Sequence, residues 1–103
     1  MPITRLWRGW TKPHDADHYE RFLLDELFPS MRELVGFIGA DVLRRPVGDD
    51  IAFVTLTRFA SMDDIHAFAG DPIDVPVIEP MAAALLAHSD DRAAHYTTYQ
   101  YRP

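Results

Sequence analysis

The sequence contains no cysteine, which excludes disulfide bridges, thiolate metal sites and a cysteine nucleophile. It has no run approaching the ~18 apolar residues that span a membrane, and no apolar secretory signal follows its first charged residues. We therefore expect a cytoplasmic protein with no membrane partner. Basic residues are also few, with 10 Lys and Arg against 16 Asp and Glu and a net charge of −6. Nucleic acid requires a basic face, so we expect no nucleic-acid partner.

What the sequence does contain is the composition of an ordinary globular domain. Of its 103 residues, 48% are hydrophobic and 25% are charged, which argues against disorder. Domains commonly hold ~50 to ~250 residues, so residues 1–103 are expected to form a single domain. No linker, internal repeat or low-complexity tract interrupts them.

Four segments rich in β-forming residues are predicted as strands. Gly48 and the two aspartates after it mark a turn that joins the second and third strands into a hairpin. The four predicted strands are residues 3–12, 37–47, 51–59 and 93–102.

Three helices are predicted between these strands. Asp15 or Asp17 is expected to cap the first, whose apolar stripe begins at Tyr19 and which should end or kink near Phe28 because Pro29 follows. Ser61 opens a capping box for the second helix, which stops at Gly70. The third is expected over residues 81–88, with a proline in its first turn.

The resulting order, β-α-β-β-α-(α)-β, predicts the α+β class and a ferredoxin-like sandwich. An antiparallel four-stranded sheet would carry the helices on one face. Phe53 and Phe59 share one face of the third strand, whereas Val54 and Leu56 share the other. Because both faces are apolar, something besides the helices must cover the second face, and a second copy of the sheet is the economical candidate. We therefore predict a homodimer.

Trp7 and Trp10 are three residues apart, so in a regular strand they point to opposite faces. One reading places one tryptophan in the core and the other in the dimer seam. In the other reading, the tryptophan that faces the helices forms a flat wall for an aromatic ligand. Alternation alone does not assign the faces, since Arg5 and Arg8 also fall on opposite phases.

Four further residues are candidates for a site. Arg58 is a candidate to hold an oxyanion at a cleft mouth, with a surface ion pair as its structural alternative. His66 is a candidate base, with a solvent-facing helical position as the alternative. His95 and Tyr96 in the last strand are read either as ligand-pocket residues or as a structural pair. His14 and His18 have a metal-like spacing, but an acidic helix start explains the segment more simply, and no metal is expected.

Five stretches of the sequence resemble the antibiotic-biosynthesis-monooxygenase-like group of the dimeric α/β-barrel superfamily over nearly the whole chain. They are Trp7-Arg-Gly-Trp10 with Tyr19, Gly36-Phe-Ile-Gly39 with Leu43-Arg-Arg45, Phe53 to Ser61, Ala67-Phe-Ala-Gly70, and His95-Tyr96. The resemblance implies a ligand cleft between helices and sheet in each subunit. It also implies one of two chemistries: cofactor-independent oxygenation of phenols or anthrones, or haem degradation.

The sequence departs from this group in having no asparagine at all. By spacing, the family's first-strand asparagine, its aromatic residue at the end of the third strand and its haem-ligating histidine fall at Leu6, Phe59 and Ile78. We therefore expect neither haem degradation nor any cofactor. The function that the resemblance favours is cofactor-independent oxidation of an electron-rich aromatic, with Phe59 among the pocket residues. A non-catalytic binder of a small aromatic and a ligand-free structural dimer are the alternatives.

Overall fold

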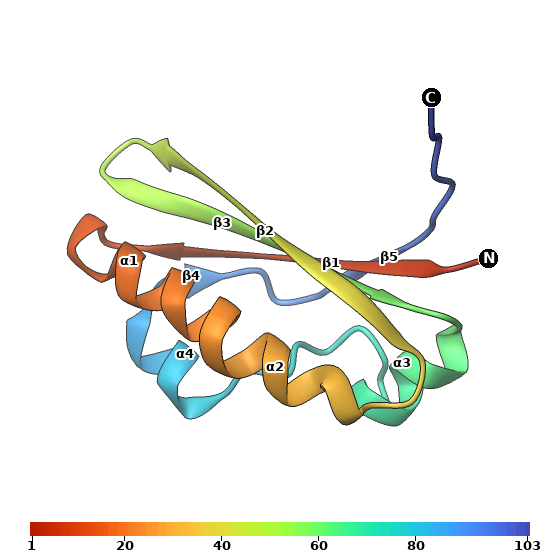
Figure 1. The fold of residues 1–103 in the computed structure, drawn as a ribbon. Helices are drawn as coiled ribbons and strands as arrows, with labels where there is room; N and C mark the ends of the chain where they lie inside the picture. Colours follow the sequence, from red (N-terminus) through yellow and green to blue (C-terminus); the bar gives the residue numbers. More distant parts are fainter.

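The computed structural model describes residues 1–103 as an antiparallel sheet with helices on one face (Figure 1). This is the α+β, ferredoxin-like arrangement that the sequence predicts. The strands run in the order β2-β3-β1-β4, and β5 pairs with the same edge of β1 as β4 does. The bounds of the five strands are β1 Ile3–Thr11, β2 Phe37–Val47, β3 Asp50–Phe59, β4 Leu86–Ser89 and β5 Ala94–Thr97.

The helical layer is built from one long segment and two short helices. The long segment comprises α1 (Pro13–Phe22), the π-helical η1 (Leu23–Leu27), α2 (Phe28–Ser30) and the 3₁₀ turn η2 (Met31–Glu33). The short helices are α3 (Met62–Ala69) and α4 (Pro80–Leu85). None of these helices has the length and hydropathy needed to cross a membrane.

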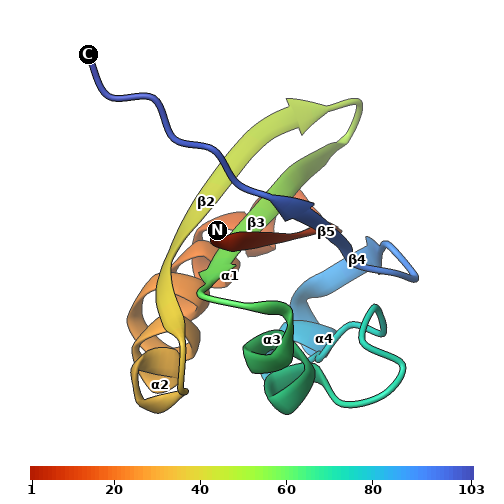
Figure 2. The same ribbon diagram turned by 90° about the vertical axis from the view of Figure 1, so that its right-hand side faces the viewer.

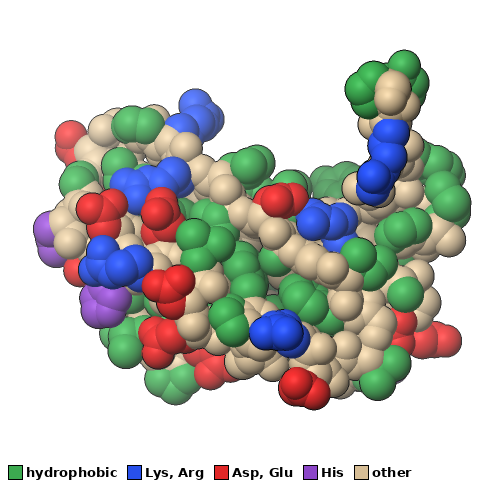
Figure 3. Space-filling view, viewed as in Figure 1, with side chains coloured by type: hydrophobic (Ala, Val, Ile, Leu, Met, Phe, Trp, Pro, Cys, Tyr) green, Lys and Arg blue, Asp and Glu red, His purple; other side chains and the backbone are tan.

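The beginning of α3 follows the prediction, whereas that of α1 does not. Ser61 Oγ accepts a hydrogen bond from the backbone N–H of Asp64, which satisfies one free amide of the first turn. The N-cap of α1 is Lys12, with no side-chain cap bond. Asp17 and Glu20 instead accept bonds from Arg44 of β2, each over 3.0 Å, so these carboxylates tie the helix to the sheet. Acidic and basic side chains lie side by side on the surface over this part of the molecule (Figure 3).

The first helix was expected to end or kink near Phe28. In the structure a π-helical turn reaches Leu27, the last α-helical piece ends at Ser30, and Met31–Glu33 form a separate 3₁₀ turn. Proline has no N–H to give to the preceding turn and its ring crowds that turn. Here a π-helical turn precedes Pro29, and the proline occupies the first turn of the next α-helical piece. A proline is tolerated in that position, so the helix continues.

The C-terminal third differs from the prediction in two places. Residues 86–89 form strand β4 rather than the end of a helix, because they pair with Gly9–Thr11 of β1. Leu86 packs against Gly9, where an added Cβ would lie 2.7 Å from Leu86 Cδ2. The last strand is shorter than expected, and residues 98–103 leave the sheet on the side away from the helices (Figures 1 and 2).

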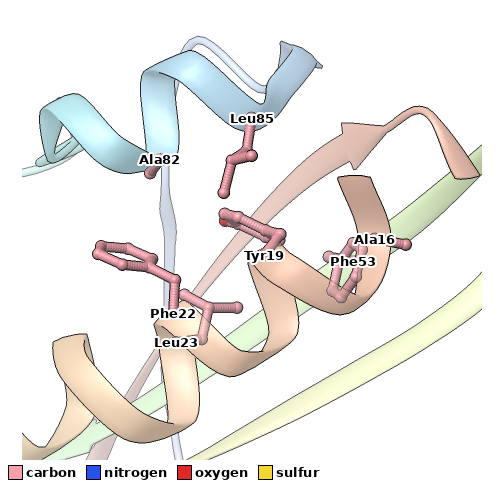
Figure 4. Packing of buried hydrophobic residues seen from close by; sticks show 7 residues of the cluster. All are labelled: Ala16, Tyr19, Phe22, Leu23, Phe53, Ala82 and Leu85. Carbon is pink, nitrogen blue, oxygen red and sulfur yellow. The ribbon is translucent and has the colours of Figure 1, made fainter. Parts of the chain in front are cut away.

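The largest core cluster lies where α1 and α4 meet the sheet (Figure 4). Tyr19 meets the ring of Phe53 edge-on, with the ring centroids 4.9 Å apart. The cluster comprises Ala16, Tyr19, Phe22, Leu23, Phe53, Ala82 and Leu85. A second cluster of Met31, Phe59 and Ile65 fills the other end of the helical layer.

The opposite face of the sheet has no helix over it (Figure 2). As predicted, Val54 and Leu56 alternate with the buried Phe53 and so point to this face. We call this uncovered side of the sheet the open face. Its residues in the three long strands and β5 include Leu6, Arg8, Trp10, Leu43, Val54, Leu56, Arg58 and Tyr96. The two apolar faces predicted from the sequence are therefore present, and one of them is uncovered in the single chain.

Candidate functional site

A cavity of about 60 Å³ lies between the helical layer and the sheet. Its floor is formed by alternate residues of two neighbouring strands, Arg5 and Trp7 of β1 and Thr55 and Thr57 of β3. The long helical segment supplies an apolar wall, and the segment 76–79 before α4 closes another side. Of 15 lining residues 10 are hydrophobic, so the cavity suits a ligand that is mostly apolar.

Arg5 is the buried charge of this cavity, with only 6% of its surface exposed. Its Nη1 donates to the carbonyl oxygen of Ile73 over 2.7 Å, and its Nη2 donates to that of Val75 over 3.0 Å. Arg5 thereby fixes the loop that leads into the cavity wall. Burial lowers the pKa of Arg5, and the charge of Asp74 partly opposes this; guanidinium nonetheless stays protonated in proteins.

His95 lies behind Arg5 on the neighbouring strand. Nη1 of Arg5 donates to Nε2 of His95 over 2.7 Å, which requires the unprotonated form of that nitrogen. Burial, and next the positive charge of Arg5, lower the pKa of His95, while Asp74 acts in the opposite direction. His95 touches the site through Arg5 and does not line the cavity itself.

Two of the aromatic side chains that line the cavity carry polar groups. The indole Nε1 of Trp7 donates to the carbonyl oxygen of Asp90 over 2.8 Å, which fixes the ring as a flat wall. Tyr19 is 1% exposed, and burial raises the pKa of its hydroxyl to about 12. The phenol therefore stays neutral at physiological pH and keeps a proton to donate.

The structure places both residues predicted to be catalytic outside this cavity. Arg58 lies on the open face, where its Nη1 donates to Asp41 Oδ2 over 2.6 Å. This is the surface ion pair of the structural alternative. His66 is exposed on α3 and is not among the cavity residues.

The five predicted pocket residues are divided among three environments. Trp7 lines the cavity, and His95 contacts it through Arg5. Trp10 and Tyr96 lie on the open face; Trp10 stacks on His88 with ring centroids 4.5 Å apart, and Tyr96 is 55% exposed. Phe59 is fully buried in the second core cluster, separated from the cavity by Phe68.

The three positions that were matched to family residues by spacing lie in different parts of the structure. Leu6 points to the open face, so Arg5 and Trp7 are the first-strand residues that reach the cavity. Ile78 lines the cavity but has no atom that binds iron. Haem does not fit these residues, because the cavity has no histidine in its lining and its volume is far below the several hundred Å³, roughly, of large ligand pockets. No group of three or more His, Asp and Glu is placed to hold a metal ion.

Sequence reasoning missed Arg5, Tyr19 and Glu79 as members of the site. Arg5 could have been recognised from the sequence, because it lies two residues from Trp7 in the strand and so points to the same face. A charged residue on the same face as a large apolar one is informative once that face is known to be buried. Glu79 had no such signal, since it lies outside the regular elements.

Solved structures with the same fold include proteins of defined chemistry. SnoaB, a cofactor-independent oxygenase from Streptomyces nogalater, matches in a mutant form with TM-score 0.64 and 20% identity over 99% of this chain and 97% of that one. A candidate antibiotic biosynthesis monooxygenase from Bacillus cereus matches with TM-score 0.64 and 17% identity over 100% and 96%. The haem degrader MhuD from Mycobacterium tuberculosis matches with TM-score 0.61 and 15% identity over 98% and 99%.

No family model matches the sequence, and no curated protein does. The structural likeness nevertheless spans the full chain, so this protein has the fold of the antibiotic-biosynthesis-monooxygenase-like proteins. That confirms the predicted fold and its resemblance. Proteins with this fold include both cofactor-independent oxygenases and haem degraders.

Proposed function

We propose that this chain is a cofactor-independent oxygenase that oxidises an electron-rich aromatic, of anthrone or quinol type, whose reacting ring lies in the cavity between helices and sheet while any further rings lie at its exposed rim. The observation that carries the proposal is the pairing of an apolar, aromatic-walled cavity with one buried cation, Arg5. The likeness to SnoaB supports the reaction class. The lack of a fitting haem site makes haem degradation the weaker candidate.

In this reaction the substrate itself supplies the electrons. Loss of a proton from an anthrone CH₂ gives a carbanion, stabilised as the enolate, that reduces O₂; one oxygen atom becomes the new carbonyl oxygen and the other leaves as water. The protein's part is to exclude water, orient the ring and stabilise the enolate. Arg5 supplies the positive charge, Trp7 the flat wall, and the neutral Tyr19 hydroxyl a hydrogen-bond donor.

The direct test is oxygen uptake by the purified protein with an anthrone and a quinol panel, with and without a chelator. We expect uptake that the chelator does not change and that Arg5→Gln lowers by about 10²-fold, the usual scale for losing one oxyanion donor. Arg21→Gln is the matched control, because Arg21 is exposed on α1 and belongs neither to the cavity nor to the open face, so this variant should leave uptake intact. Saturable binding without uptake would instead indicate a non-catalytic binder. No binding of any aromatic would indicate a structural protein.

We further propose that the active form is a homodimer in which two open faces pack together. Leu6, Leu43, Val54 and Leu56 form an apolar centre on this face, and an exposed apolar sheet of this kind commonly marks an interface. Light scattering at micromolar concentration should give twice the mass of the chain. Leu56→Asp should shift the protein to monomer, whereas a monomeric wild type would contradict the proposal.

A further inference from the structure

We propose that Arg5 is an anion-binding residue and that the cavity takes an acidic aromatic ligand, whose carboxylate or phenolate group sits against the Arg5 guanidinium. The inference rests on the proposed function for the identity of the site, and it narrows the substrate to a class. It concerns binding, so it is testable without turnover.

Four of the eight other arginines contact a carboxylate at the surface. They are Arg8 with Asp90, Arg44 with Asp17 and Glu20, Arg58 with Asp41, and Arg92 with Asp74. Arg5, by contrast, is buried and forms no ion pair; the acceptors that it contacts are two backbone carbonyls and a neutral imidazole. A buried charge without a counter-charge is costly, and a ligand anion would remove that cost.

Two N–H donors of the Arg5 guanidinium remain without a partner. Guanidinium has five N–H groups, and the protein uses three of them, two on Nη1 and one on Nη2. The Nε–H and the second Nη2–H have no acceptor in the protein. Nε and Nη2 stand on the same side of the planar group, and two parallel bonds from such an edge are the usual way in which arginine holds a carboxylate.

The charges around the cavity are unevenly distributed between its buried and its exposed sides. Asp74 is the carboxylate whose charge acts on Arg5, but its side chain is 44% exposed and is engaged by Arg92. Glu79 also lines the cavity but is exposed to solvent. An acidic ligand would therefore place its anionic group at the buried Arg5 end and an uncharged edge toward Glu79. The ring between them would contact Trp7 and the apolar helical wall.

The size of the cavity limits the ring system. At about 60 Å³ it is smaller than the ~150 Å³ of an enclosed cavity that holds one benzene ring. A single aromatic ring is therefore the largest system that it can take, and part of that ring would lie at the rim beside the exposed Val77, Ile78 and Glu79. Benzoate and benzamide have nearly the same shape, and benzamide lacks the negative charge. Any difference in their affinities therefore reports on the charge.

Calorimetric titration of the full-length protein with each probe tests the proposal. We expect benzoate to bind about tenfold more tightly than benzamide or better. Arg5→Gln should abolish this preference while leaving benzamide affinity unchanged, and Arg21→Gln, a change at an exposed position on α1, should change neither affinity. Equal affinities for the two probes, no binding of benzoate, or an equal loss in Arg5→Gln and Arg21→Gln would each overturn the proposal.

Arg5 also holds the loop at Ile73 and Val75, so Arg5→Gln carries a risk of misfolding. Glu79→Gln avoids this risk, because it changes an exposed side chain at the rim. Removal of the negative charge at the rim should tighten benzoate binding and leave benzamide binding unchanged; weaker benzoate binding would contradict the proposal. Selective benzoate binding without oxygen uptake would support this inference and reject the oxygenase. Oxygen uptake with neutral anthrones that does not depend on Arg5 would support the oxygenase and reject this inference.

Discussion

Arg5 and His95 face each other across strands β1 and β5, and Nη1 of Arg5 donates to Nε2 of His95 over 2.7 Å. The bond exists only while His95 is neutral, because a protonated imidazole has no acceptor. The same guanidinium also donates to the carbonyl oxygens of Ile73 and Val75 and so fixes the loop that contains them. The protonation state of His95 is therefore linked to the stability of the cavity wall.

The first prediction concerns this pH dependence. The pKa of His95 is lowered in the folded state, so the unfolded chain binds the proton more readily. The stability that His95 contributes is complete above its unfolded pKa of about 6.5 and is lost as pH falls below that value. We expect the urea midpoint to fall between about pH 7.5 and pH 5.5, a range above the titration of most carboxylates.

His95→Gln is the variant that isolates the effect. Its amide oxygen can accept from Arg5 at every pH, so the fall in the midpoint over this range should become smaller. His66→Gln is the control, because His66 is exposed on α3. A pH profile of His95→Gln that is unchanged from wild type would show that another group is responsible.

The second prediction concerns the turn before β2. Gly36 has φ +81°, and a Cβ there would overlap the side chain of Asp64 at the beginning of α3. Gly36→Ala should therefore lower the free energy of unfolding by about 2 kcal/mol or more, since it combines backbone strain with a steric clash. Gly48→Ala is the matched control: its φ is +58°, but nothing lies within 4 Å of the added Cβ, so the loss should be about 1 kcal/mol. Equal losses would show that the clash with Asp64 is relieved at no cost.

The third prediction concerns the cap of α3. Ser61→Ala removes the oxygen that accepts from the Asp64 amide and should cost about 1 kcal/mol of stability. Ser30→Ala serves as the comparison, because Ser30 is exposed and its hydroxyl donates to the carbonyl of Leu27 within its own helix. Chemical denaturation of the two variants should show a loss only for Ser61→Ala.

The fourth prediction separates the two tryptophans. Trp7 lines the cavity, whereas Trp10 stacks on His88 at the open face. In Trp10→Phe, the remaining indole emission should respond to a cavity ligand and change little with protein concentration. In Trp7→Phe, it should respond to dilution through the dimer equilibrium and change little with ligand. The opposite assignment of the two responses would contradict the placement of the site.

Much of the fold was predictable because its elements are encoded locally. The β2–β3 hairpin follows from strand-forming residues around Gly48, which has positive φ in the structure. The end of α3 at Gly70, also at positive φ, follows in the same way. The sequence predicted a helix over β4 because Ala82 to Leu86 are good helix formers. Residues 86–89 form a strand because they pair with the free edge of β1, where Leu86 packs against Gly9.

The candidate site was predictable only in part. Because side chains alternate between the two faces of a strand, the sequence shows that Trp7 and Trp10 lie on different faces. The alternation does not show which of these faces the helices cover. In the structure Arg58, the predicted oxyanion-holding residue, lies beside Asp41 on the open face, whereas Arg5, to which the sequence assigned no role, lines the cavity. Phe59 was expected to line the pocket; it lies on the helical face, but Phe68, which belongs to another element, separates it from the cavity.

The sequence by itself determined the relative facing of residues along each strand, the fold class and the presence of two apolar sheet faces, because these depend on short-range periodicity and composition. Only the tertiary structure decided which arginine is buried, where the chain leaves the sheet after Thr97, and which aromatic residues wall the cavity. The reason is physical. These features depend on contacts between residues far apart in the chain, such as Arg5 with Ile73 and His95, and no local pattern records such contacts.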